Sequence, residues 1–245
     1  MAAEQYRPSG FKLLPDVVKN LLIINGLFFF ATIVPEQRGV NLIDILGLHY
    51  FGSEKFHPYQ LITYMFMHGG FWHIALNMFA LWMFGAAVEN IWGPRKFLVY
   101  YLFCGIGAAI THYAVLYFQL SPDINEINNF IASHTLSSGE LSQVYQQRTD
   151  LLNAPIVVGA SGAIFGLLLA YGMIFPNSII YLYLAIPIKA KYFVILYGLM
   201  ELFSGVAGGA NDNVAHFAHL GGLLFGFILI MFWRYQNHRR NKYFK

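Results

Sequence analysis

Six long apolar stretches alternate with more polar connections along the 245 residues of the chain. Each is long enough to cross the hydrocarbon core of a bilayer, which takes about 20 apolar residues in a helix. The predicted helices cover residues 17–34, 72–89, 96–119, 156–175, 188–206 and 215–234. The pattern predicts an all-α polytopic membrane protein, a bundle of six transmembrane helices.

The connections between these stretches differ in character. Residues 35–71 are mixed and rich in aromatic side chains, which favours a structured element at the membrane interface. Residues 90–95 predict a short turn, and the polar residues 120–154, rich in Asn, Ser and Gln, predict a water-exposed outer loop. Residues 176–187 are apolar but bounded by two prolines. They fit either a short interfacial strand or an early start of the fifth helix.

The composition supports a membrane location and narrows the range of partners. The chain is 57% hydrophobic and only 11% charged, about half the usual charged share. A formal charge of +3 is too small to suggest a nucleic-acid partner, and the single Cys104 excludes an intrachain disulfide. The polar start of the chain shows no cleavable signal peptide, so the first apolar run is expected to be an anchor in the lipid bilayer.

The distribution of Lys and Arg predicts the orientation, because basic residues concentrate on the cytoplasmic side. With the N-terminus inside, all but three of the 15 basic residues fall on the inner side, the exceptions being Arg38, Lys55 and Arg148. Both termini are then cytoplasmic. The expected organisation is a cytoplasmic segment 1–16, a membrane domain 17–235 with the outer loop 120–154, and a basic cytoplasmic tail 236–245.

In this orientation the second, fourth and sixth helices all run inward. His73, Asn77, Ser161 and His219 then lie within roughly 10 Å of the outer ends of their helices, at 1.5 Å per residue. Polar side chains inside a membrane usually face a bundle interior or a cavity. The shared depth predicts that these four side chains converge.

Ser161 and His219 are the candidate nucleophile and base, because a serine hydroxyl needs a base within hydrogen-bond reach to become reactive. Taken alone, Ser161 is more often a small residue at a helix contact. Gly222 and Gly226 form a small-xxx-small face on the sixth helix, and His219 shares that face. If the helix packed there is the fourth, His219 meets Ser161.

His73 and Asn77 are spaced i, i+4 and therefore lie on one face of the second helix. Their N–H groups and the Ser161 N–H could bind a developing oxyanion. The alternative is a hydrogen bond between helices that only holds the second helix in place.

Three motifs carry a family resemblance: Gly159-Ala160-Ser161-Gly162, Ala218-His219-Leu220-Gly221-Gly222 and His73-Ile74-Ala75-Leu76-Asn77. Phe66-Met67-His68-Gly69-Gly70, Glu89-Asn90-Ile91-Trp92-Gly93 and Pro187-Ile188-Lys189-Ala190-Lys191 add to it. Together they resemble the rhomboid intramembrane serine proteases, over about residues 15–235. The resemblance implies an endopeptidase that cuts transmembrane proteins near the outer membrane face, in a bacterial inner membrane.

The resemblance also implies roles for single residues. Ser161 would be the nucleophile and His219 the general base and acid of a dyad without a third acid. The resemblance implies an oxyanion site at His73, Asn77 and the backbone of Gly159. Phe165 matches the aromatic position on which the catalytic imidazole packs. His68 matches a histidine near the water-facing cavity.

The chain departs from the family pattern, and other functions stay open. Residues 35–71 lack the Trp-Arg pair common in the first outer loop of the family. A catalytically inactive relative, acting as a scaffold or chaperone for membrane proteins, would typically lack the serine or the histidine. A small transporter or channel would need ionisable residues along a whole path, whereas here they gather at one end.

No cofactor and no metal are expected. His216 and His219 could ligate zinc, but a third ligand is needed and the sequence does not identify one. His216 is expected to hydrogen-bond at the start of the sixth helix. Glu89 is expected to cap or bridge helices, and Glu201, inside the fifth span, needs a buried partner that the sequence does not name.

Overall fold

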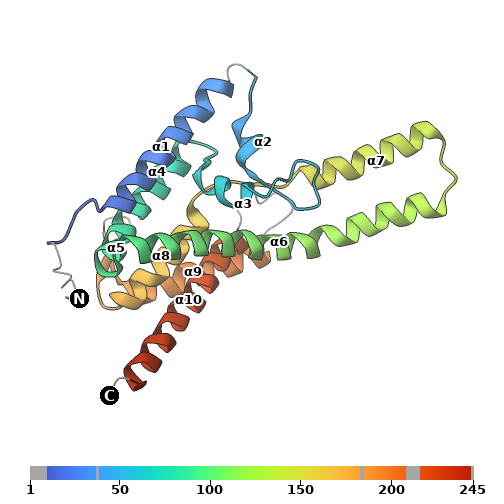
Figure 1. Ribbon diagram of the computed structural model, residues 1–245. Coiled ribbons are helices and arrows are strands. Elements are labelled where there is room, and N and C mark those ends of the chain that lie inside the picture. Colours follow the sequence, from blue (N-terminus) through green and yellow to red (C-terminus); the bar gives the residue numbers. More distant parts are fainter. Residues whose placement is uncertain (1–9, 37–38, 183–184, 208–215, 244–245) are drawn as a thin grey trace.

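The computed structural model describes residues 10–36, 39–182, 185–207 and 216–243. Residues 1–9 of the predicted N-terminal segment, Arg38 and the last two residues of the predicted tail lie outside this range, as do the side chains of 34–36 and 239–243. Figure 1 shows a helical bundle from which one long hairpin projects.

The prediction of an all-α membrane bundle is confirmed, and each of the six predicted spans contains a helix. The helices are α1 (Asp16–Glu36), α4 (Phe71–Ala80) continued by the π-helical η2 (Leu81–Gly85) and α5 (Ala86–Trp92), α6 (Pro94–Ser133), α8 (Ser161–Ile174), α9 (Ala190–Ala207) and α10 (His216–Tyr243). In the described part of the chain, five spans are long and apolar enough to cross a membrane. The exception is α8, whose 14 residues rise about 21 Å.

The fourth helix begins five residues later than the sequence predicts. Residues 156 and 157 form β2 (Ile156–Val157), which pairs antiparallel with β1 (Leu48–His49). Gly159 follows at φ +123°, in a region that favours glycine. An extended segment held by a sheet, not a helix, therefore brings the chain down to Ser161.

The segment 35–71 is structured, as predicted. It contains α2 (Leu42–Leu46), β1, α3 (Gln60–Thr63) and the 3₁₀ turn η1 (Tyr64–Phe66). The buried Tyr64 hydroxyl donates to the Gly105 carbonyl of α6 at 2.7 Å, and the Tyr64 carbonyl accepts from the Gly159 N–H at 2.9 Å. This connection ties α6 to the turn that precedes Ser161.

The polar segment 120–154 is largely helical, where the sequence predicts a loop. Helix α6 continues to Ser133, and α7 (Ser138–Asn153) begins with a capping box between Ser137 and Glu140. Figure 1 shows the far half of α6 and α7 side by side, projecting away from the other helices. A small cluster of Tyr50, Leu116 and Leu152 packs this hairpin against the bundle.

The apolar segment 176–187 adopts the strand alternative. Strands β3 (Ile179–Leu182) and β4 (Ile186–Lys189) pair antiparallel, with Ile180 opposite Ile188. The turn predicted at 90–95 is built on Gly93, whose φ of +78° ends α5 and whose next residue, Pro94, starts α6.

Helices α8 and α10 touch backbone to backbone at the predicted small-residue face. A Cβ on Gly222 would lie only 1.8 Å from the carbonyl oxygen of Gly162. A Cβ on Gly166 would meet Cys104 of α6 at 2.4 Å, and one on Gly226 would meet the Tyr100 hydroxyl at 2.4 Å. The face on α10 is therefore packed against α8, which carries Ser161, at Gly222 and against α6 at Gly226.

Glu89 caps α1 from a neighbouring helix, in agreement with the sequence prediction. Its carboxylate accepts the Val17 N–H at 3.0 Å and the Val18 N–H at 2.8 Å, and its side chain is 3% exposed. The first N–H groups of a helix have no partner within the helix, and a negative charge there is favourable. Glu89 therefore fixes the start of α1 to α5.

Replacing Glu89 by Gln should destabilise the bundle, because an amide removes the charge and turns one acceptor into a donor that faces an N–H group. We expect a loss of about 2–3 kcal/mol in the free energy of unfolding, measured by denaturation in detergent micelles. The control Glu126→Gln, at an exposed position of α6, should change it by less than about 0.5 kcal/mol. Equal stability of the two variants would contradict the capping role.

Candidate active site

Ser161 and His219 meet at one end of the bundle. The Ser161 Oγ lies 2.8 Å from Nε2 of His219, a hydrogen-bond distance between residues 58 positions apart in the sequence. Ser161 is the first residue of α8, and His219 lies in the first turn of α10. The contact between Gly162 and Gly222 brings these two helix ends together.

The ring of Phe165 orients the imidazole. Phe165 lies one turn after Ser161, and its ring stacks on that of His219 with centroids 4.3 Å apart and planes inclined by 5°. Such stacking restricts rotation of the imidazole about the Cβ–Cγ bond. Ser161, Phe165 and His219 thus form one contiguous group from two helices.

A carboxylate completes this group on the side away from the serine. Oε2 of Glu201 in α9 lies 2.9 Å from Nδ1 of His219 and 2.7 Å from Nδ1 of His216. The sequence flagged Glu201 as needing a partner but did not find it. Its depth alone could have placed Glu201 at the same end of the bundle as Ser161 and His219, because α9 runs opposite to α8 and α10 and Glu201 lies six residues before the end of α9.

Glu201 is also the side chain that could be a third metal ligand beside His216 and His219, which the sequence did not identify. One ligand atom each from Glu201, His216 and His219 lies within 4.8 Å of the others. The distances from the Glu201 carboxylate to the two imidazoles are short enough for a hydrogen bond or an ion pair. The carboxylate therefore contacts both imidazoles directly.

His73 lies beside the turn before Ser161. Its Nδ1 accepts the Gly69 N–H at 3.4 Å, which assigns the ring proton to Nε2. A Cβ built on Gly159 would meet that Nε2 at 2.7 Å and the Ser161 Oγ at 3.7 Å. The absence of a side chain at Gly159 therefore leaves room for an N–H donor close to the serine.

The other predicted site residues lie further from the serine. His68 is 1% exposed and packs edge-on against His73, with centroids 5.0 Å apart. Burial, with a smaller effect from His73, lowers the pKa of His68 to about 4, so its imidazole is neutral at pH 7. Asn77 is buried one turn after His73, and no contact described for this part of the chain joins its side chain to Ser161.

The backbone around the serine favours an anion. Ser161 opens α8, and helix N-termini present N–H groups and a partial positive charge. The Gly159 N–H is occupied by the Tyr64 carbonyl, so it is not free to bind an anion. The arrangement can transfer a proton from a hydroxyl to an imidazole and stabilise a negative charge beside it.

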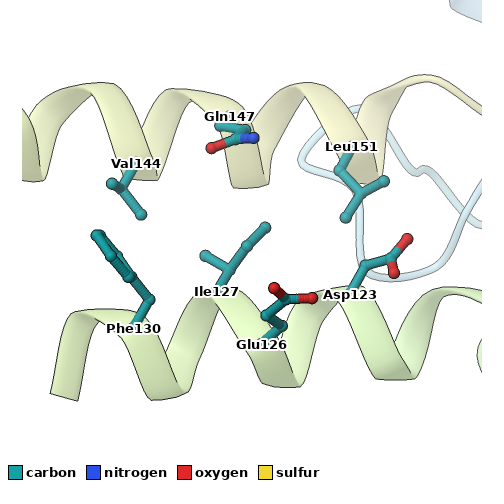
Figure 2. Close-up of a pocket in the computed structure, with 7 residues that line it drawn as sticks. All are labelled: Asp123, Glu126, Ile127, Phe130, Val144, Gln147 and Leu151. Carbon is teal, nitrogen blue, oxygen red and sulfur yellow. The ribbon is translucent and has the colours of Figure 1, made fainter. Parts of the chain in front are cut away.

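The cavity in the hairpin lacks this chemistry. About 440 Å³ in volume, it lies between α6 and α7 (Figure 2). It is lined by Asp123, Glu126, Ile127, Phe130, Val144, Gln147 and Leu151. These are apolar, amide and acidic side chains, and the serine–histidine pair lies in the bundle.

A serine hydroxyl within hydrogen-bond distance of an imidazole is the arrangement that serine hydrolases use, and here it joins the short apolar helix α8 to α10, which is long and apolar enough to cross a membrane. Comparison with known proteins identifies the family. A family model described as the Rhomboid domain matches residues 55–236, well over half of the chain. The chain belongs to the rhomboid family.

Similar relatives come from bacteria and from eukaryotic organelles. YdcA of Bacillus subtilis is 26% identical over 232 residues, covering 94% of each chain. Rhomboid protease AarA of Providencia stuartii is 27% identical over 227 residues, which cover 86% of this chain and 69% of AarA. RHOMBOID-like protein 12, mitochondrial, of Arabidopsis thaliana is 26% identical over 211 residues, covering 84% of this chain and 55% of the relative.

The chain spans about half the length of three Arabidopsis relatives, between 43% and 59%. The family model nevertheless covers Ser161 and His219 in a single match. Membership of this family supports an intramembrane protease activity in general and an integral membrane location.

Replacing Gly159 by Ala should disturb the site, because the added Cβ would collide with His73 and the φ of +123° is strained for any other residue. We expect a loss of about 1–3 kcal/mol in the free energy of unfolding in micelles. Gly69→Ala is the matched control, since no atom lies within 4 Å of its added Cβ. An unchanged stability of Gly159→Ala would show that this turn relaxes freely.

Proposed function

We propose that the chain is an intramembrane serine endopeptidase that cleaves transmembrane proteins near the outer membrane face through a Ser161–His219 dyad. The observation that carries the proposal is the 2.8 Å hydrogen bond from Ser161 Oγ to His219 Nε2, in a chain of the rhomboid family. An inactive scaffold would not need this contact, which joins two helices at the distance that proton transfer requires.

In the proposed reaction, Ser161 Oγ attacks the carbonyl carbon of the scissile peptide bond, and its proton passes to Nε2 of His219. The resulting tetrahedral intermediate collapses as the C–N bond breaks, and His219 returns the proton to the leaving amine. Water then attacks the acyl-serine with His219 as base, which releases the second fragment and restores the hydroxyl.

The negative charge of the tetrahedral intermediate would be held by donors beside the serine. The Ser161 N–H at the start of α8 and the Nε2–H of His73 are the proposed pair. Asn77, one turn along from His73, would join them when substrate is bound. Gly159 would contribute space rather than a hydrogen bond, because its N–H already donates to Tyr64.

A transmembrane substrate must unwind locally to present its carbonyl, because a helical backbone is hydrogen-bonded internally. Access from the lipid is proposed beside α9, the helix that carries Glu201. The excess of basic residues on the opposite side would place the site at the outer face with both termini in the cytoplasm, in a bacterial inner membrane.

Labelling with a fluorophosphonate tests the dyad, because this probe forms a covalent bond only with an activated serine. We expect no labelling of Ser161→Ala and a labelling rate reduced by about 10⁴-fold or more in His219→Ala, measured by gel fluorescence of purified protein in micelles. The control Ser133→Ala, on the exposed hairpin, should label like the original chain. Undiminished labelling of either dyad variant would refute the assignment.

His73→Ala tests the proposed oxyanion site. Loss of one preorganised donor should lower the labelling rate about 100-fold, since such donors stabilise the transition state rather than the bound reagent. The measurement is the time course of fluorophosphonate labelling, with His134→Ala, an exposed histidine of the hairpin, as control. Equal rates in the two variants would remove His73 from the oxyanion site.

A further inference from the structure

The carboxylate of Glu201 contacts the catalytic imidazole at the nitrogen that the proposed dyad leaves unused. Oε2 of Glu201 lies 2.9 Å from Nδ1 of His219, whose other nitrogen faces Ser161. The side chains of Glu201 and His219 are only 15% and 12% exposed. A largely buried carboxylate in an apolar helix is costly unless it is paired, so Glu201 needs a contact of this kind.

The proton position that His219 needs for catalysis gives its contact with Glu201 a role. To accept the Ser161 proton, Nε2 must carry no proton, so the ring proton must be on Nδ1. Within the described residues, Nδ1 is buried and has no aligned hydrogen bond, and the Glu201 carboxylate lies beside it. Catalytic hydrogen bonds are often poorly aligned before substrate binds and tighten in the complex.

We propose that Glu201 is a positioning residue that holds His219 in the tautomer and orientation needed to activate Ser161, making the site a Ser161–His219–Glu201 triad. The inference rests on the proposed protease function and would add a third acid to the proposed Ser161–His219 dyad. Glu201 would also offset the positive charge that His219 acquires when it takes the serine proton.

His216 provides a way to separate this role from a structural one. Its Nδ1 lies 2.7 Å from the same Oε2, so Glu201 joins α9 to α10 through two imidazoles. Only one of these, His219, contacts Ser161. If the carboxylate merely ties the helices together, removal of His216 should matter as much as removal of the charge on Glu201.

The test measures fluorophosphonate labelling at several probe concentrations, which separates the maximal inactivation rate from the half-saturating probe concentration. In this reaction Ser161 Oγ bonds to phosphorus, fluoride leaves, and the hydroxyl proton passes to His219. The variants are Glu201→Gln, Glu201→Asp, His216→Ala and Ser161→Ala, each checked for folding by thermal unfolding in micelles.

We expect Glu201→Gln to lower the maximal rate about 100-fold or more, because an amide can donate to Nδ1 and favour the unproductive tautomer. Its half-saturating concentration should stay within about threefold of the original, since the imidazole acts on the chemical step. The maximal rate of Glu201→Asp should be at least about tenfold higher than that of Glu201→Gln, because the Asp carboxylate keeps the charge. The maximal rate of His216→Ala should stay within about threefold of that of the original chain.

A maximal rate in Glu201→Gln equal to that of the original chain would overturn the proposal. A loss of maximal rate in His216→Ala as large as that in Glu201→Gln would also overturn it. If Glu201→Gln does not fold, Glu201→Asp decides: a lowered maximal rate with unchanged half-saturation supports the role, and the original rate overturns it. A change of more than about threefold in the original chain on treatment with EDTA would assign the three side chains to a divalent cation instead. Labelling that persists in Ser161→Ala would defeat the protease proposal itself, a separate result.

Discussion

The site depends on the backbone contact between α8 and α10. At Gly162 and Gly222 the two helices approach so closely that no side chain, not even a methyl group, would fit between them. In a membrane, where lipid tails are as apolar as leucine, such close packing is a main source of helix association. Because the contact lies one residue after Ser161 and three after His219, it also sets the distance between hydroxyl and imidazole.

In the proposed orientation, the length of α8 would give the site its depth. A hydrocarbon core is about 30 Å thick, so a helix of about 21 Å that starts from one face ends well inside it. The strand β2 and the Gly159 turn bridge the remaining distance. Irregular backbone at membrane depth is tolerated only where protein or water satisfies it. Here the Tyr64 carbonyl accepts the Gly159 N–H, which satisfies the irregular backbone directly before Ser161.

Residue patterns predicted the helices, and shared depth predicted the meeting of Ser161 with His219. Hydropathy could not show that Ile156 and Val157 form a strand before α8 begins, because apolar β-branched residues suit a strand and a membrane helix equally. The polar segment 120–154 was predicted as a loop because it is rich in Asn, Ser and Gln. Its helices make few apolar contacts, so hydropathy does not reveal them. Glu201 was recognised as an unpaired charge, yet its partner depends on the direction in which α9 and α10 face, which a single sequence does not specify.

The hairpin of α6 and α7 has a practical consequence for handling this protein. Its tip, residues 134–137, lies at the far end of two exposed helices and is remote from the packed bundle (Figure 1). Exposed tips of this kind accept inserted sequence readily. An epitope or a small fluorescent domain grafted there would project away from the bundle, giving a handle for purification or imaging that leaves the buried machinery untouched.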